Sequence, residues 1–297
     1  ITYAQRIQGA SLPPSKLVRS IFPEHFIFYR PRNIVSGDFY WMTQKGNKIV
    51  AVVADCTGHG VPGAFMSMFG IAFLNEIVNK ISTNKHIDAL QSDDILNQLR
   101  DKVKQSLHQE EEDSSWIGID LGLIVIDIEN RILQFSGAYN PLLVIRGGQI
   151  IERKGDKMPI GMHRKAHLSF SKSSIDLQEN DNVYLFTDGF ADQFGGKSGR
   201  KYLKKNLKNY LREISPLPLA EQKVLIEEEY DTWRDSYEQV DDILVCGFKI
   251  TKEIGIKAEK ESTDWNDKHI LIVEDVEENY FLLASVLGAT QAQITRA

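Results

Sequence analysis

The segment from Val53 to Ala64, VADCTGHGVPGA, constrains this chain more than any other. The apolar run before it ends on a carboxylate, Asp55, and three glycines follow within residues 58–63. Pro62 suits the first turn of a helix, and the apolar spacing after it is helical. The segment predicts a buried strand, an acidic turn and a helix. A carboxylate at such a strand end presents oxygen to a hard cation, although one Asp–Gly turn can also be only a turn.

A second carboxylate, Asp38, is expected to lie beside Asp55. The runs 37–44 and 47–54 have strand-like composition and flank Lys45-Gly46, which predicts a β-hairpin. In that hairpin the two aspartates occupy neighbouring strand ends.

The composition excludes several classes of protein. A formal net charge of −6 over 297 residues leaves no basic stripe for phosphate backbones, so we expect no nucleic-acid partner. Cys56 and Cys246 lie in apolar runs without CxxC spacing, which indicates reduced core thiols in a cytoplasmic protein. No apolar run approaches the length of a membrane span. Because the first residue is Ile1, we expect an upstream region, through which a membrane sensor would tether the full-length protein.

Helical and strand-like spacings alternate in blocks along the chain. An N-terminal helical repeat is followed by strands, a helix pair, more strands, a helical region and a last strand. This order favours an α+β fold, with sheets covered by helices, over repeated βαβ units. The expected helices span residues 1–12, 62–81, about 93–107 and 201–236.

Changes in composition predict four regions. Residues 1–20 are assigned to an N-terminal linker helix from an upstream region, and residues 21–252 to one large domain. Residues 253–268 are polar and charged, which is typical of a linker. Residues 269–297 begin with an apolar strand and are assigned to the start of a second domain.

Acidic residues lie at the ends of predicted strands far apart in the sequence: Asp38, Asp55, Asp188 and the pair Asp241-Asp242. Packing them together is costly unless a cation neutralises them. All are oxygen ligands, and the seven histidines show no HxxxH or HExxH spacing, so magnesium or manganese is favoured over zinc. Two such ions, bridged by a shared carboxylate and a water, can hydrolyse phosphate esters.

These motifs resemble those of the SpoIIE-like, PPM-type (protein phosphatase 2C-like) serine/threonine phosphatases. The resemblance spans about Tyr3 to Ile250 and rests on an ordered set of motifs. It implies an αββα sandwich of two antiparallel β-sheets flanked by helices, with two divalent cations, manganese or magnesium, in a cleft at one end. The matching segments are AQRIQ at 4–8, SGDFYW at 36–41, ADCTGHGVPGA at 54–64, FSGAYNPL at 135–142, FTDG at 186–189, ADQFGG at 191–196 and DDILV at 241–245.

The resemblance implies a role for each acidic position. Asp38 corresponds to the carboxylate that bridges both ions. Asp55 and the backbone carbonyl of Cys56 match the ligands of one ion, and Asp188 with Asp241 those of the other.

Further residues are expected around these ligands. Asp242 is expected to support them from behind, and Gly58 and Gly60 to keep the loop tight. Arg32 is a candidate phosphate contact, although an arginine before a metal motif is more often structural. His59 is not assigned as the general acid, because the histidine of eukaryotic protein phosphatase 2C falls two places after its aspartate, not four.

The last region resembles the start of a response-regulator receiver domain. Residues 270–273 match its first strand, and Glu274 and Asp275 match its magnesium-binding acidic pair. The phosphoacceptor aspartate is absent, so this incomplete α/β receiver fragment at the C-terminus is expected to contribute nothing to hydrolysis. Its unpaired strand is expected to be poorly ordered or to promote self-association, for instance as a homodimer.

The leading hypothesis is a metal-dependent phosphatase of bacterial signal transduction that acts on phosphoserine or phosphothreonine in a regulatory protein. By resemblance, that substrate is a STAS-domain anti-anti-sigma factor. An upstream sensory domain and a complete receiver domain are the other expected partners in the full-length chain. The alternative is a non-catalytic, phosphatase-like scaffold between a sensor and a receiver. We also expect regulation through the helices at 62–81 and 93–107, because the first begins directly after the Asp55 loop.

Overall fold

Strand β3 (Lys48–Cys56) is buried along most of its length, which explains its continuous apolar sequence. Side chains alternate between the two faces of a strand. Val50 and Val52 therefore pack in a core beneath helices, whereas Ile49 and Val53 pack in a second core between two sheets. The strand thus separates a helical layer from a facing sheet.

Two antiparallel sheets face one another. The first is ordered β2-β3-β4-β5-β9, with β8 paired to β4, and the second is ordered β1-β13-β10-β6-β7. In chain order the other strands are β1 (His25–Arg30), β2 (Phe39–Lys45), β4 (Gly118–Asp127), β5 (Ile132–Ala138), β6 (Leu142–Arg146), β7 (Gln149–Arg153), β8 (Ile160–Gly161), β9 (Ser173–Asp176), β10 (Asn182–Phe186), β11 (Phe194–Gly195), β12 (Arg200–Lys201) and β13 (Ile243–Lys249). The short strands β11 and β12 form a separate hairpin.

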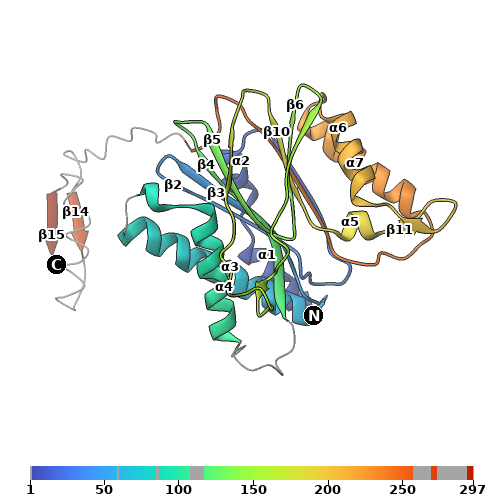
Figure 1. Ribbon diagram of the computed structural model, residues 1–297. Coiled ribbons are helices and arrows are strands. Elements are labelled where there is room, and N and C mark those ends of the chain that lie inside the picture. Colours follow the sequence, from blue (N-terminus) through green and yellow to red (C-terminus); the bar gives the residue numbers. More distant parts are fainter. Residues whose placement is uncertain are drawn as a thin grey trace. The chain divides into compact units, whose positions relative to one another are not determined.

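Helices cover both outer faces. Helices α3 and α4 lie on the first sheet and α6 and α7 on the second, as Figure 1 shows. The predicted αββα sandwich is therefore confirmed. The helices are α1 (Thr2–Ser11), α2 (Ser15–Ile21), α3 (Val61–Asn84), the 3-10 turn η1 (Ile87–Ala89), α4 (Ser92–Ser106), α5 (Gly189–Asp192), α6 (Lys204–Ile214) and α7 (Leu219–Arg234).

The computed structural model describes residues 2–58, 60–84, 87–107, 117–256, 269–272 and 293–296. Residues 1–255 form one compact unit and residues 256–297 another. The region expected to be an N-terminal linker helix contains α1 and most of α2, and both helices belong to the first unit.

The second unit contains one described pair of parallel strands, β14 (His269–Ile272) and β15 (Gln293–Arg296). Glu274 and Asp275, the expected receiver acids, lie outside the described residues.

One described segment, Val61–Thr83 in α3, has the length and mean hydropathy, 1.5, of a membrane span, contrary to the expectation from the sequence. Half of this segment is buried within the unit. Leu74 and Val78 pack in the core that α3 shares with α4 and the first sheet, so α3 has the contacts of a core helix.

Candidate active site

Three aspartates lie in a row across one end of the first sheet. Asp55, near the end of β3, is paired directly with Asp120 near the start of β4. The pairing of Phe39 with Ala54 places Asp38, one residue before β2, on the other side of Asp55. Because Val53 faces the second sheet and side chains alternate, Asp55 and its cross-strand neighbours face it too.

Asp120 was not singled out from the sequence. It lies inside a strand-like run, whereas the other candidates lie at strand ends. The sequence feature that could have identified Asp120 is its position as a carboxylate in the otherwise apolar run 117–126. Burial, and then the charge of Asp188, raise the pKa of Asp120 to about 7, while Lys204 opposes the shift. Asp120 therefore belongs to the same acidic group.

The second sheet brings its own acids to this end. Asp188 directly follows Thr187, whose backbone N–H donates to the Leu244 carbonyl at 3.0 Å, so the end of β10 lies beside the start of β13. Asp241 and Asp242 immediately precede β13. The predicted strand-end acids therefore gather at one end of the sandwich.

Hydrogen bonds from the second sheet hold both the backbone and the side chain of Asp38. The hydroxyl of Tyr29 in β1 donates to the Asp38 carbonyl at 3.2 Å. The hydroxyl of Thr187 donates to Asp38 Oδ2 at 2.6 Å, and the same hydroxyl oxygen accepts from the Leu244 N–H at 3.1 Å. Asp38 is 1% exposed. The Thr187 bond fixes the orientation of a buried carboxylate.

Burial and neighbouring negative charges raise the pKa values of Asp38 and Asp55. Burial raises the pKa of Asp38 well above its ordinary value, and the charges of Asp242, Asp241 and Asp188 raise it further, against the Thr187 hydrogen bond. Burial also raises the pKa of Asp55, followed by the charges of Asp38, Asp188, Asp241 and Asp120. The aspartates therefore lie close enough, in a poorly solvated region, for their charges to act on Asp38 and Asp55.

Asp242 fastens the loop that carries Asp38. Its carboxylate accepts from the backbone N–H groups of Arg32 and Gly37, both at 2.7 Å, and it is 3% exposed. Its own N–H donates to Asp241 Oδ1 at 2.8 Å. Asp242 therefore supports the Asp38 loop. The Arg32 residue is exposed, while its backbone N–H is bound to Asp242.

The loop after Asp55 packs tightly against the Asp38 loop. Gly58 and Gly60 have φ angles of +91° and +69°, which disfavour other residues. A Cβ on Gly37 would lie 2.7 Å from the Gly58 carbonyl oxygen and 3.1 Å from the Cys56 carbonyl oxygen, so the two loops leave no room for a side chain there. A Cβ on Gly63 would lie 2.1 Å from the Gly58 carbonyl oxygen, which excludes any side chain there.

Helix α1 is tied to the same loop by Gln8. The Gln8 amide donates to the Ser36 carbonyl at 2.6 Å and to Ser67 Oγ on α3 at 2.9 Å, and its oxygen accepts from Ser36 N–H at 3.0 Å. Ser36 Oγ in turn accepts from Asp38 N–H at 3.0 Å. One buried side chain therefore connects α1 to both the Asp38 loop and α3.

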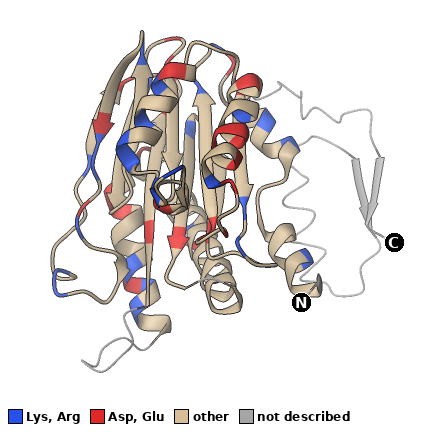
Figure 2. Cartoon of the chain, turned by 90° about the vertical axis from the view of Figure 1, so that its right-hand side faces the viewer, with Lys and Arg blue, Asp and Glu red and all other residues tan. Residues whose placement is uncertain are grey.

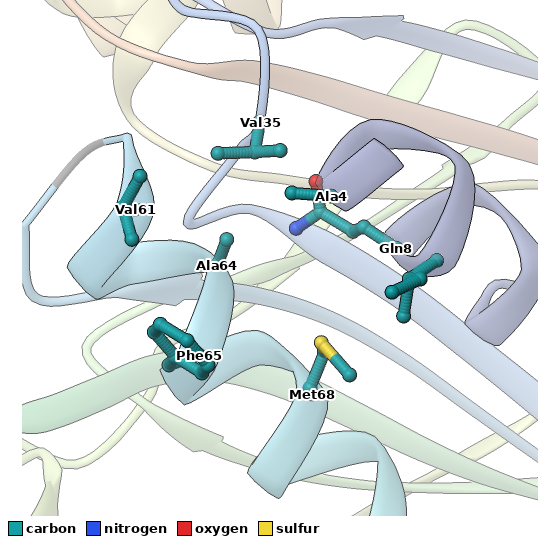
Figure 3. A pocket seen from close by; sticks show the side chains of 8 residues that line it. Ala4, Gln8, Val35, Val61, Ala64, Phe65 and Met68 are labelled. Atoms are coloured by element: carbon teal, nitrogen blue, oxygen red, sulfur yellow. The ribbon is translucent and has the colours of Figure 1, made fainter. Parts of the chain in front are cut away.

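A small apolar pocket of about 160 Å³ lies beside this connection. Figure 3 shows that its side chains come from α1, from α3 and from the segment before Asp38. The lining residues are Ala4, Ile7, Gln8, Val35, Val61, Ala64, Phe65 and Met68.

The donor set fits a hard divalent cation. The site offers carboxylate and carbonyl oxygens, and a cation would offset both the burial and the neighbouring negative charges that raise the pKa values of Asp38 and Asp55. Among the described residues, however, no three His, Cys, Asp or Glu side chains form a ready-made metal cluster.

Comparisons with known proteins agree with this architecture. The family described as "Stage II sporulation protein E (SpoIIE)" matches residues 45–251. No curated protein matches the chain. The chain belongs to the SpoIIE family, and its class is that of the PP2C-type phosphoprotein phosphatases. Neither result supports the receiver resemblance, because the family match ends before that region.

Three solved structures illustrate the similarity. The SiaA-PP2C domain of Pseudomonas aeruginosa has 29% identity and a TM-score of 0.75 over 84% of this chain and 95% of that one. The PP2C phosphatase domain of SpoIIE from Bacillus subtilis, with a fragment of its regulatory domain, has 19% identity and a TM-score of 0.59 over 77% and 61%. RsbX in complex with magnesium has 12% identity and a TM-score of 0.51 over 76% and 94%. At these low identities, the SpoIIE and RsbX structures show only that the fold is shared.

Proposed function

We propose that this chain hydrolyses phosphoserine or phosphothreonine on a regulatory protein, with two divalent cations, manganese or magnesium, in the acidic cleft. The observation that carries the proposal is the convergence of aspartates from both sheets around the buried Asp38. Burial, and then the charges of the neighbouring aspartates, raise the pKa values of Asp38 and Asp55. Such a group is costly without a positive charge among its members. The family supplies the class of reaction.

Each residue has a defined part in the proposal. Asp38, central and buried, would contact both cations. Asp55 and the Cys56 carbonyl would hold one cation, and Asp188 and Asp241 would hold the other. When bound, such cations polarise a water molecule and offset the charge of the phosphoryl group.

The supporting residues position these ligands. Thr187 orients Asp38, and Asp242 holds the Asp38 loop by two backbone N–H groups. The exposed guanidinium of Arg32 is proposed to contact the substrate phosphate, since its main chain is fixed to Asp242.

The proposed protein substrate is a STAS-domain anti-anti-sigma factor, as the family resemblance implies. The proposed setting is cytoplasmic. An upstream sensory domain and a complete receiver in the full-length chain remain proposed partners, and so does self-association through the C-terminal strands.

Hydrolysis of a phosphoserine peptide in the presence of manganese tests the proposal. The intact chain should release phosphate, and Asp38→Asn or Asp188→Asn should abolish release. Asp127→Asn is a matched control, because Asp127 is a buried aspartate at the other end of β4 that pairs with Lys48 at 3.3 Å. Unchanged hydrolysis by Asp38→Asn would show that the ligand assignment is wrong.

One observation favours the alternative of a non-catalytic scaffold. The described carboxylates are near one another but do not form a ready-made cluster of three ligands. A scaffold would retain the sandwich and its docking surfaces without binding two cations. The two proposals therefore differ in cation stoichiometry.

A further inference from the structure

The segment 193–212 is strongly basic in an acidic chain, so the expectation from the net charge that the chain has no basic stripe is wrong for this segment. It contains seven lysines and arginines and no aspartate or glutamate, whereas the whole chain has a net charge of −6. The segment forms the β11–β12 hairpin and most of α6. Figure 2 looks onto the face of the molecule that carries these elements. The basic residues are Lys197, Arg200, Lys201, Lys204, Lys205, Lys208 and Arg212.

Most of this positive charge is not neutralised locally. Lys201 pairs with Asp192 at 2.8 Å and Lys208 with Glu152 at 2.6 Å. Within the part of the chain that the structure describes, the other five form no salt bridge. Lys197, Arg200 and Lys205 among them are exposed.

Two large apolar side chains lie within this basic segment. Phe194 is 38% exposed and Leu203 is 55% exposed. Aromatic residues and arginine, here Phe194 and Arg200, are enriched in surfaces that bind another protein. The segment therefore exposes both positive charges and apolar side chains to solvent.

The hairpin is firmly seated on α7. Gly196 N–H donates to the Trp233 carbonyl at 2.8 Å, and the Trp233 indole N–H donates to the Gln193 carbonyl at 3.1 Å. A Cβ on Gly195 would lie 1.9 Å from the Trp233 carbonyl oxygen, so only glycine allows this contact. The basic side chains are therefore presented on a fixed platform.

The basic segment is hydrogen-bonded to two segments that adjoin proposed cation ligands. Leu203 N–H donates to the Ala191 carbonyl at 2.7 Å, and Ala191 lies in α5, which begins directly after Asp188. The buried side chain of Gln193 accepts from the N–H of Val240, one residue before Asp241, at 3.2 Å. The basic surface thus starts within a few residues of two proposed cation ligands.

We infer that the surface formed by residues 194–205 binds an acidic stretch of the substrate protein next to its phosphorylated residue. This inference rests on the proposed phosphatase function. A phosphoprotein with acidic flanks is repelled by an empty acidic cleft, and a fixed basic surface at its edge offsets that repulsion and orients the approach. The surface therefore selects substrates by the charge that flanks the phosphorylated residue.

Two phosphoserine peptides test the inference, one flanked by Asp and Glu and the other by Asn and Gln. The intact chain should prefer the acidic peptide by about ten-fold in kcat/KM at low salt, through KM. The triple variant Lys197→Glu/Arg200→Glu/Lys205→Glu should lose that preference. The triple variant Lys16→Glu/Lys80→Glu/Lys154→Glu changes the net charge equally at exposed lysines elsewhere and should keep it. Equal preference in both variants, or none in the intact chain, overturns the inference.

Binding without hydrolysis separates this inference from the proposed function. Fluorescence anisotropy in EDTA should show that the labelled acidic peptide binds the intact chain more tightly than the first triple variant. Binding with no hydrolysis of either peptide would contradict the phosphatase proposal and leave the docking surface supported. Tighter binding of a single-stranded RNA oligonucleotide than of the acidic peptide would overturn the docking assignment.

Discussion

Thr187 is the residue whose removal tests the cleft with least disturbance. Replacing it with valine keeps the shape but removes the hydroxyl that donates to Asp38 at 2.6 Å. Loss of a hydrogen bond that orients a ligand lowers metal affinity by roughly 10–100-fold. The variant also loses the bond that the hydroxyl accepts from the Leu244 N–H, and each of these two buried hydrogen bonds contributes about 1 kcal/mol of stability. Manganese titration should show this loss for Thr187→Val and recovery for Thr187→Ser. Equal affinity in Thr187→Val and the unchanged chain would contradict the role.

Asp120 gives a prediction about pH. Its folded pKa, about 7, lies above the value of about 3.9 in an unfolded chain, so the folded chain holds the extra proton between these values. The free energy of unfolding of the metal-free protein should therefore fall as the pH rises from about 5 to 7. Asp38 and Asp55 shift in the same direction.

Thermal melting in EDTA at several pH values checks this. Asp120→Asn should flatten the fall in Tm between pH 5 and 7 relative to the unchanged chain. A Tm that falls equally steeply in Asp120→Asn would show that Asp120 does not titrate in this window.

The strand-end position made Asp38, Asp55, Asp188 and Asp241 predictable, because an apolar run that stops on an acid is visible in the sequence. Asp120 was missed because its position depends on the register of β3 against β4, which a single sequence does not specify. The hydrogen bonds of Gln8 escaped notice for a similar reason, since they join residues 28 and 59 positions apart.

At the scale of elements, α1 is expected to control the cleft through Gln8. Gln8→Met keeps the length of the side chain but removes every hydrogen bond to Ser36 and Ser67. Because those bonds hold the Asp38 loop against α3, activity should fall by about ten-fold or more, beyond the loss of folded protein. Gln5→Met, an exposed position on the same helix, is the matched control.

Activity per folded molecule is the deciding quantity for α1. Circular dichroism gives the folded fraction, and phosphate release gives the rate. If Gln8→Met lost activity only in proportion to its folded fraction, α1 would be a structural helix and not a control element.

The helices and the main strands were largely predictable because their apolar periodicity is long and regular. The helix at 62–81 was found, but its N-terminal contacts with α1 were not, since these depend on tertiary packing. The short elements α5, β11 and β12 carry too few residues to show a period, yet they support the basic surface.

At the scale of the whole molecule, the sandwich followed from the order of strands and helices together with the family resemblance. The receiver resemblance of residues 269–297 stays a prediction, because its acidic pair lies outside the described residues. Deleting residues 263–297 should leave catalysis intact, since the family match ends at residue 251. A large loss of turnover after this deletion would show that the C-terminal region belongs to the active unit.

The central claim is that the aspartates of the two sheets hold two divalent cations. Calorimetric titration of the intact chain with manganese, in the presence of the phosphoserine peptide, tests it most directly. The account predicts two ions per chain, with Asp38→Asn weakening binding by more than the roughly 10–100-fold expected for loss of a supporting hydrogen bond. A chain that binds no manganese, or an Asp38→Asn variant that binds two ions as tightly as the unchanged chain, would contradict the claim and favour the scaffold.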